Sequence, residues 1–146
     1  MKLELKHLAG YLPYNLKVLS GFGEYSEIDS LYFSKDNHKR PSLNLMVSHF
    51  PKGFRGENFK DIKPILRPLS DLNKEIEETG NTYFDLLYYE FDRNGQNGFD
   101  FMYLEHKPLE YPFYIVQKLL EWHFDVFGLI ENGLAISIND VCQADA

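Results

Sequence analysis

Short segments of helical and of strand-like pattern follow one another along this chain, and glycine and proline residues separate them. Some segments repeat apolar residues at helical spacing, whereas others alternate apolar and polar residues as a half-buried strand does. The two types are interspersed without the regular spacing of strand–helix–strand units. This order predicts an α+β fold, with a mainly antiparallel β-sheet and about three helices packed on it.

Three segments have the features of helices. Gly10 marks the end of a short first helix. Ser70 is placed to cap a second helix, and Gly80 supplies its left-handed stop. Pro112 is tolerated in the first turn of a third, whose apolar residues spread over one wide arc. Helices are therefore expected over residues 3–9, 71–78 and 111–124.

Strands are expected where β-branched and aromatic residues alternate with polar ones. The strongest hairpin signal is a pair of aromatic-rich runs, 86–91 and 99–104, on either side of a loop that contains Asn-Gly twice. By contrast, the prolines and glycines of residues 50–57 predict a loop. The other expected strands cover residues 15–20, 28–33, 43–48 and 134–138.

The length of 146 residues is that of one domain. Twelve Phe, ten Tyr and one Trp supply more apolar surface than disordered chains carry, so a packed core is expected. We therefore expect a single domain over residues 1–146, with a loose tail at about 142–146.

The net charge of −7 disfavours binding of nucleic acid by the whole surface, because such a surface repels phosphate. One cysteine, Cys142, can form no disulfide within the chain and no zinc cluster. The N-terminal segment lacks the continuous apolar run of a secretory signal, and no apolar run is long enough to span a bilayer. These features favour a soluble, cytoplasmic protein that makes no contact with membranes.

Charge is unevenly distributed along the chain. Residues 35–67 carry eight basic and three acidic side chains, a net charge of +5, whereas residues 68–146 have a net charge of −11. The basic segment could bind nucleic acid, or it could pair with the acidic half of the chain within the fold or across a homo-oligomer. The residues of this candidate patch are Lys39, Arg40, Lys52, Arg55, Lys60, Lys63 and Arg67.

One histidine is a candidate for chemistry. His123 lies on the apolar side of the expected 111–124 helix, and Asp125 follows two residues later. It could act as a buried general base or a metal ligand, but a core histidine bonded to backbone carbonyl groups explains the position better. The histidines lack the spacing of a metal site, and the glycines lack the pattern of a phosphate-binding loop. No cofactor, metal ion or catalytic residue is therefore expected.

Three segments resemble a group of small proteins from Bacteroidetes genomes, many of which look phage- or prophage-encoded. They are residues 8–14, residues 61–72 (DIKPILRPLSDL), and the stretch KLLEWHFDVFGLI at 118–130. The resemblance implies a bacterial or phage cytosolic setting and gives no position a catalytic role. In its last segment Trp122, Phe124, Phe127 and Leu129 have the character of an aromatic plug. The residues expected to be structural are Trp122, His123, Phe124 and Phe127.

The leading hypothesis is a non-enzymatic accessory or protein-interaction protein of a mobile element, because aromatic residues are abundant and no catalytic constellation is present. Its partner would be another protein or a second copy of the chain. Two alternatives stay open. One is a nucleic-acid accessory factor that uses residues 35–67, and the other is a small hydrolase or metal-dependent enzyme that uses His123 and a carboxylate.

Overall fold

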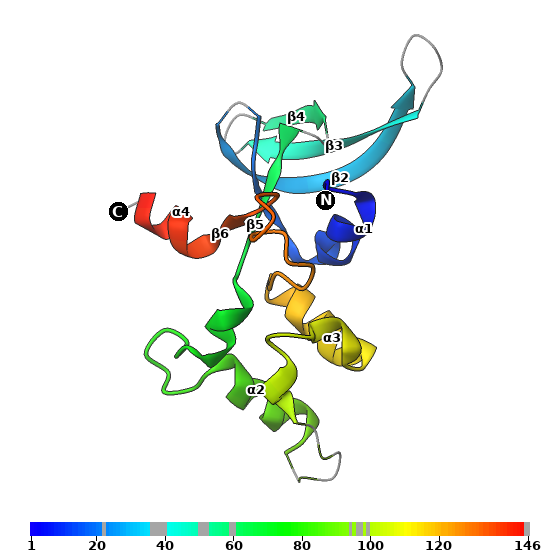
Figure 1. Ribbon diagram of the computed structural model, residues 1–146. Coiled ribbons are helices and arrows are strands. Elements are labelled where there is room, and N and C mark those ends of the chain that lie inside the picture. Colours follow the sequence, from blue (N-terminus) through cyan, green and yellow to red (C-terminus); the bar gives the residue numbers. More distant parts are fainter. Residues whose placement is uncertain are drawn as a thin grey trace.

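A sheet forms one end of the molecule in the computed structural model, and the helices α2 and α3 lie at the other end (Figure 1). The backbone is described for residues 1–21, 23–35, 41–49, 53–58, 61–93, 95, 98 and 100–144. Side chains are described for residues 1–21, 23–28, 30, 61–93, 95, 98 and 100–141.

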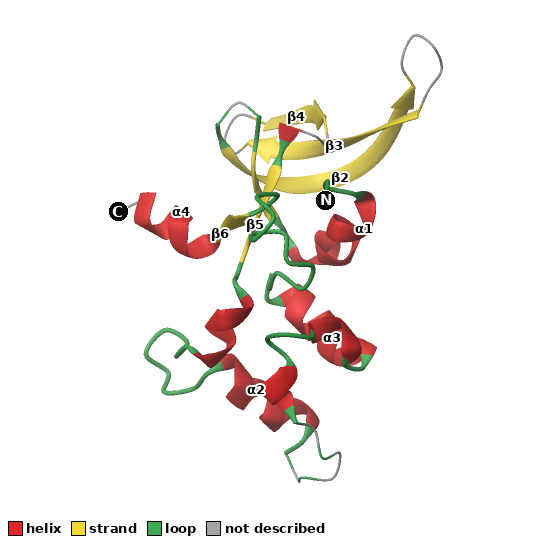
Figure 2. Cartoon of the chain, viewed as in Figure 1, coloured by secondary structure: helices red, strands yellow, loops and turns green. Residues whose placement is uncertain are grey.

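Six strands form the sheet, in the order β4-β3-β2-β1-β5-β6. Four pairings are antiparallel, and the pairing of β5 with β6 is parallel, so the sheet is mixed. Together with the helices this is an α+β fold, as the sequence predicts (Figure 2). The strands are β1 (Lys17–Leu19), β2 (Tyr25–Lys35), β3 (Pro41–His49), β4 (Gly53–Asn58), β5 (Lys63–Leu66) and β6 (Ile136–Ser137).

Strands β1, β2 and β3 confirm the strands expected in the first third of the chain. Val18 of β1 is fully buried, and it lies opposite Ser26 of β2 and Pro64 of β5. A tight turn connects β1 to β2, with Gly23 at φ +80° and its amide bonded to the Ser20 carbonyl group at 3.0 Å. This positive φ accounts for glycine at the turn.

The loop expected over residues 50–57 is a wrong prediction for its second half. Residues 53–58 form β4 at the edge of the sheet, where Gly56 lies opposite Met46 of β3. Pairing along β3 outweighs the low strand propensity of glycine, and an edge position tolerates such a residue.

The first expected helix differs in length and type. Helix α1 (Leu5–Leu8) passes directly into the 3-10 helix η1 (Ala9–Tyr14), so neither Gly10 nor Pro13 ends the helical segment. Pro13 lies inside η1 and cannot donate the hydrogen bond of its turn, yet the helix continues to Tyr14. A Cβ atom at Gly10 would lie 2.7 Å from Leu120 Cδ1, so glycine allows η1 to approach α3 closely.

The expected helix over 71–78 is also wrong. A 3-10 helix, η3 (Leu69–Asn73), follows Pro68, and Ser70 lies inside it and caps nothing. Beyond it, Glu77 and Glu78 have φ values of 39° and 61°, which no α-helix contains. Tertiary contacts of Asp71, described below, take the place of the helix.

The expected hairpin of 86–91 and 99–104 is wrong as well. Residues Tyr83–Phe91 form the helix α2, and Phe101–Tyr103 form the 3-10 helix η4. Helix α2 starts with a capping box. The Asp85 carboxylate accepts a hydrogen bond from the Thr82 amide, and the Thr82 hydroxyl group accepts one from the Asp85 amide. This start signal outweighs the strand propensity of the aromatic residues.

The third expected helix is confirmed in a shorter form, α3 (Phe113–Glu121), preceded by the 3-10 helix η5 (Pro108–Glu110). The expected last strand contracts to β6, and α4 (Ile138–Ala144) follows it. The tail expected to be loose from Cys142 is therefore helical as far as Ala144.

The core lies between the sheet and the helices and draws on both ends of the chain. Tyr11 of η1, Leu66 of β5, Leu119 of α3 and Phe124 are all fully buried and belong to one apolar cluster. Burial of a large apolar side chain contributes about 1.5–3 kcal/mol, so this shared core holds the N-terminal and C-terminal segments together.

Candidate functional site

The segment after α3 lies beside the end of β5 as a short parallel bridge. The Arg67 amide donates to the His123 carbonyl group at 2.7 Å, and the Asp125 amide donates to the Arg67 carbonyl group at 2.8 Å. His123 and Asp125, the candidates for chemistry, are therefore part of a backbone contact with Arg67. We call this contact between Arg67 and residues 123–126 the junction.

The carboxylate of Asp125 caps the turn that follows. Asp125 is 5% exposed, and its two oxygens accept the amides of Leu129 at 2.8 Å and of Ile130 at 2.9 Å. Hydrogen bonds from amides to an ionised carboxylate are stronger than neutral ones. The side chain thus organises residues 125–130.

The hydroxyl group of Tyr11 serves the same junction. It donates to the Phe124 carbonyl group and accepts the Val126 amide at 3.4 Å. Burial, and then the nearby charge of Asp125, raise the pKa of this phenol well above its usual range. Tyr11 therefore stays protonated and acts as a structural donor.

His123 lies beyond the end of α3, so it is not on the apolar face of that helix. Its backbone is in the left-handed region, at φ 63°. Its ring is half-buried, and Nε2 lies 2.6 Å from the Tyr14 carbonyl oxygen, so Nε2 carries the proton that it donates. Burial lowers its pKa, and the positive charges of Arg67 and Lys17 lower it further. The imidazole is a neutral link between η1 and the junction.

The aromatic residues of the predicted plug contact one another through Tyr83 of α2. The centroid of the Tyr83 ring lies 5.1 Å from that of Trp122 and 4.9 Å from that of Phe124. Phe127 packs instead against the buried His7 of α1, at 5.3 Å. Of the four residues expected to be structural, Trp122, Phe124 and Phe127 thus each make aromatic contacts, and His123 makes a hydrogen bond.

The residues of the candidate basic patch fall into three groups. Lys63 is exposed in β5, whereas the Arg67 guanidinium lies over the rings of Tyr83, at 5.2 Å, and Phe124, at 5.8 Å. Arg55 lies in β4, and its side chain is outside the described part. Lys39, Arg40, Lys52 and Lys60 also lie outside the described residues.

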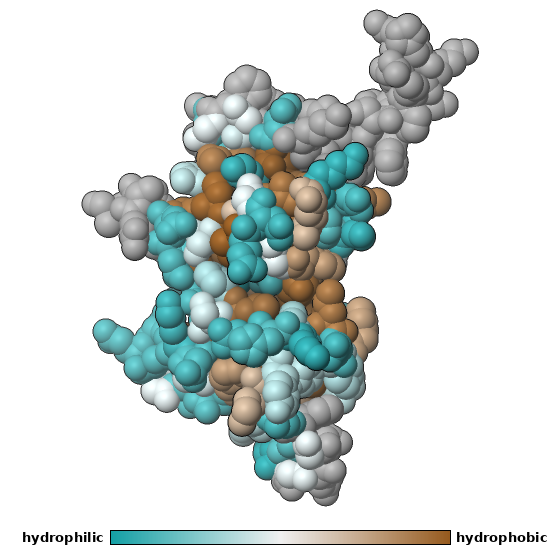
Figure 3. Space-filling view, viewed as in Figure 1, coloured by the Kyte–Doolittle hydropathy of each residue, from teal (hydrophilic) through white to brown (hydrophobic). Residues whose placement is uncertain are grey.

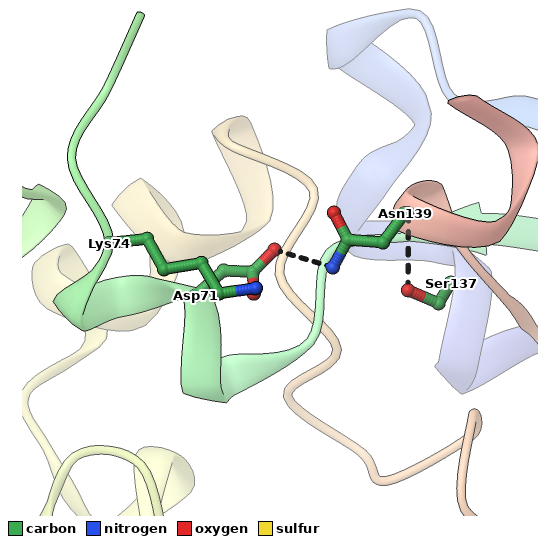
Figure 4. A network of polar contacts seen from close by, with 4 residues as sticks. All are labelled: Asp71, Lys74, Ser137 and Asn139. Carbon is green, nitrogen blue, oxygen red and sulfur yellow. Dashed lines mark hydrogen bonds and ion pairs between the residues drawn. The ribbon is translucent and has the colours of Figure 1, made fainter. Parts of the chain in front are cut away.

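Asp71 joins the middle of the chain to its C-terminal helix (Figure 4). This carboxylate is 4% exposed, accepts a hydrogen bond from Asn139 Nδ2 at 3.0 Å, and has Oδ1 2.8 Å from Lys74 Nζ. The hydroxyl group of Ser137 accepts the Asn139 amide at 3.2 Å at the start of α4. The contact explains why an acidic residue is buried in η3.

Large apolar side chains are exposed in the part of the chain that runs from the start of α2 to the start of α3, residues 82–114, which we call the helical lobe. Of the ten such side chains that are exposed in the described part, seven lie between residues 88 and 114. The face in Figure 3 shows apolar surface beneath the sheet and in this lobe, with hydrophilic side chains interspersed. We call the seven residues the exposed apolar cluster: Tyr88, Tyr89, Met102, Tyr103, Leu109, Phe113 and Tyr114.

Ring contacts and an ion pair hold this lobe together. Phe91 at the end of α2 lies 5.2 Å from Tyr114 of α3, and Glu90 pairs with Lys118 at 3.3 Å. Tyr88 meets the buried ring of Phe101 at 4.6 Å. The elements that carry the exposed side chains are therefore packed against one another.

A hollow of about 410 Å³ opens where η4, η5 and the start of α3 meet. Its size lies within the range of ligand-binding clefts. It is lined by Asp100, Tyr103, Lys107, Glu110, Tyr111 and Pro112.

Comparison of the chain with protein-family models, curated proteins and solved structures gives no match. Among the described residues, no helix has the length and apolar character needed to cross a membrane. In the same part of the chain, no group of three His, Cys, Asp or Glu side chains is arranged to hold a metal ion.

The exposed apolar cluster does not follow from the sequence patterns, because four of its residues, Tyr88, Tyr89, Met102 and Tyr103, fall in the expected hairpin. The signal that locates it is the Thr82-x-x-Asp85 capping box, which predicts a helix over the following residues. On a helix, Tyr88 and Tyr89 lie away from the buried Leu87, at positions that face solvent.

Proposed function

We propose that this protein is a non-enzymatic interaction module that binds another protein through the exposed apolar cluster. The observation that carries the proposal is the exposure of this cluster: Phe113 is 74% exposed, Met102 71% and Tyr89 67%. Exposed apolar surface disfavours the free state by about 25 cal/mol per Å², and aromatic and Met side chains are enriched in interfaces. A partner that covers the cluster recovers that free energy.

Charge indicates the kind of partner. Residues 82–114 carry six acidic and two basic side chains, a net charge of −4. Two copies of this lobe would bring like charges together, which costs free energy. We therefore infer that the partner is a different protein, with an apolar centre and a basic rim.

The resemblance of residues 8–14, 61–72 and 118–130 to phage-associated proteins favours a bacterial cytoplasmic setting, with the chain as an accessory protein of a mobile element. The alternative of nucleic-acid binding is less favoured, since Arg67 contacts aromatic rings and residues 82–114 have a net negative charge. The enzymatic alternative is less favoured because His123 and Asp125 bond to backbone groups.

Site-specific photo-crosslinking in the cells of origin tests the proposal. A benzophenone amino acid replaces Phe113 or Met102, and the matched control places it at Glu131, which is exposed between α3 and β6. We expect one foreign protein to be crosslinked from both cluster positions and not from Glu131. Mass spectrometry then identifies it, and its affinity is remeasured with purified proteins.

The variants Phe113→Ser and Met102→Ser provide the quantitative test. Each is expected to weaken the purified complex about tenfold, as truncation of an interface residue typically does when it costs about 1.4 kcal/mol, while Glu131→Gln leaves affinity unchanged. The proposal is overturned if the cluster crosslinks to a second copy of this chain, or if neither serine variant weakens the complex.

A further inference from the structure

The hollow between η4 and η5 lies within the same lobe as the exposed apolar cluster, and Tyr103 belongs to both. A hollow inside an interface typically receives one anchoring side chain of the partner. The chemistry of its lining therefore indicates which residue of the partner it takes, an inference that rests on the proposed function.

The walls of the hollow are fixed in advance. The Tyr111 hydroxyl donates to the Asp100 carbonyl group, which joins the end of η5 to the start of η4. The Tyr111 ring stacks on Phe101 at 6.0 Å with an angle of 23° between the planes, and Phe101 is 1% exposed. A preformed site loses less conformational entropy on binding.

The lining attracts a positive charge. It contains two carboxylates, Asp100 and Glu110, and one ammonium group, Lys107. Asp100 Oδ1 accepts the Met102 amide at 2.9 Å, which leaves Oδ2 for a ligand. Lys107 Nζ lies 4.0 Å from Glu110 Oε1, and both side chains are more than 60% exposed, so this ion pair is weak. Burial and the neighbouring Asp100 raise the pKa of Tyr111, which keeps its ring neutral.

We propose that the hollow accepts an arginine side chain of the partner protein. The guanidinium plane stacks on the exposed ring of Tyr103, and its N–H groups donate to the carboxylates of Asp100 and Glu110. Arginine fits better than lysine, because a planar fork of donors can stack on an aromatic ring and pair with carboxylates at once, whereas an ammonium group is a point charge. This occupant also supplies the basic character that the lobe requires of its partner.

Titration of the isotope-labelled full chain with N-acetyl-arginine amide, followed by amide NMR shifts, tests this assignment. We expect saturable shifts at Tyr103, Lys107 and Tyr111 in the millimolar range. N-acetyl-citrulline amide has nearly the same shape without the charge, and it should cause no saturable shift. N-acetyl-lysine amide should bind more weakly than the arginine probe.

Two variants of the hollow should act in opposite directions. Glu110→Gln removes an acceptor charge and should weaken probe binding about threefold, as loss of an exposed ion pair does. Lys107→Gln removes the competing cation and should strengthen binding about twofold. Partial unfolding cannot produce this gain, and the matched control Glu131→Gln should leave binding unchanged.

Equal shifts with citrulline and arginine, or no gain in Lys107→Gln, would overturn the arginine site. If crosslinking from Phe113 still identifies a partner in that case, the proposed function stands without it. Conversely, if the probe binds as expected but Phe113→Ser leaves the complex intact, the proposed function fails and the arginine site stands.

Discussion

The hydroxyl group of Tyr11 donates a hydrogen bond to the carbonyl group of Phe124, 113 positions further along the chain. The same oxygen accepts the Val126 amide. All three residues are buried, so water cannot replace either bond. One phenol thus satisfies two backbone groups of the junction beside β5.

Tyr11→Phe should lower the free energy of unfolding by about 1–3 kcal/mol, because two buried backbone groups lose their partner while the ring is kept. Urea unfolding followed by circular dichroism measures the change. The control is Tyr14→Phe, since the Tyr14 hydroxyl accepts a long hydrogen bond of 3.4 Å from Gln117 at the surface. Equal losses in the two variants would contradict the role given to Tyr11.

Asp125→Asn should lower the free energy of unfolding by about 1.5–3 kcal/mol, the range for hydrogen bonds to charged groups. An amide side chain offers one oxygen and one NH2 group, so only one of the Leu129 and Ile130 amides keeps an acceptor. Glu131→Gln removes an equal charge from an exposed position and should change stability by less than about 0.5 kcal/mol. A neutral result for Asp125→Asn would show that the two amides find other acceptors.

Thr82→Ala should lower the free energy of unfolding by about 1 kcal/mol, because the N-cap of α2 loses its acceptor for the Asp85 amide. Thr82→Ser keeps a hydroxyl group at the same place and serves as the control. The comparison is made by thermal unfolding of both variants beside the unaltered chain. Should serine be as damaging as alanine, the hydroxyl bond contributes nothing.

Stability should fall as the pH drops below about 6.5, the ordinary value for histidine. Burial lowers the pKa of both His7 and His123 in the folded chain. The unfolded chain therefore binds protons first as the pH falls, which favours unfolding in acid. Well above pH 6.5 both rings are neutral in either state, and the contribution of the two histidines to stability is fully present. Urea midpoints at pH 7.5 and 5.5 measure this loss.

His7 has a specific reason to resist protonation. Its Nδ1 accepts the Glu4 amide at 3.0 Å, and a proton on that nitrogen would remove the acceptor. His7→Gln and His123→Gln should each reduce the difference between the two midpoints, whereas His106→Gln, an exposed position, should leave it unchanged. An undiminished difference in both variants would show that other groups cause it.

Local pattern was sufficient for part of the fold. The strands around Val18 and Ile28 and the helix over Ile115 to Leu119 were predictable, because each buries one regular face against the core. For the same reason the α+β class followed from the order of the segments.

Other elements depend on contacts that no local pattern reveals. Strand β4 exists because β3 pairs with it. In η3, the Asp71 side chain bonds to Asn139, which is 68 positions away in the sequence. The candidate site depends still more on such contacts. Exposure of Phe113 and the hollow beside Tyr111 arise only when η4, η5 and α3 come together.

The parallel pairing of β5 with β6 has a consequence for biosynthesis. Ile65 has no neighbour on that side until Ile136 has been made, and the Tyr11 hydroxyl has no Phe124 carbonyl group to bond until Phe124 has been made. Contacts of such high sequence separation slow the search for the native state. A nascent chain on the ribosome therefore leaves this edge of β5 unpaired until Ile136 has been made, which makes this intermediate a substrate for chaperones.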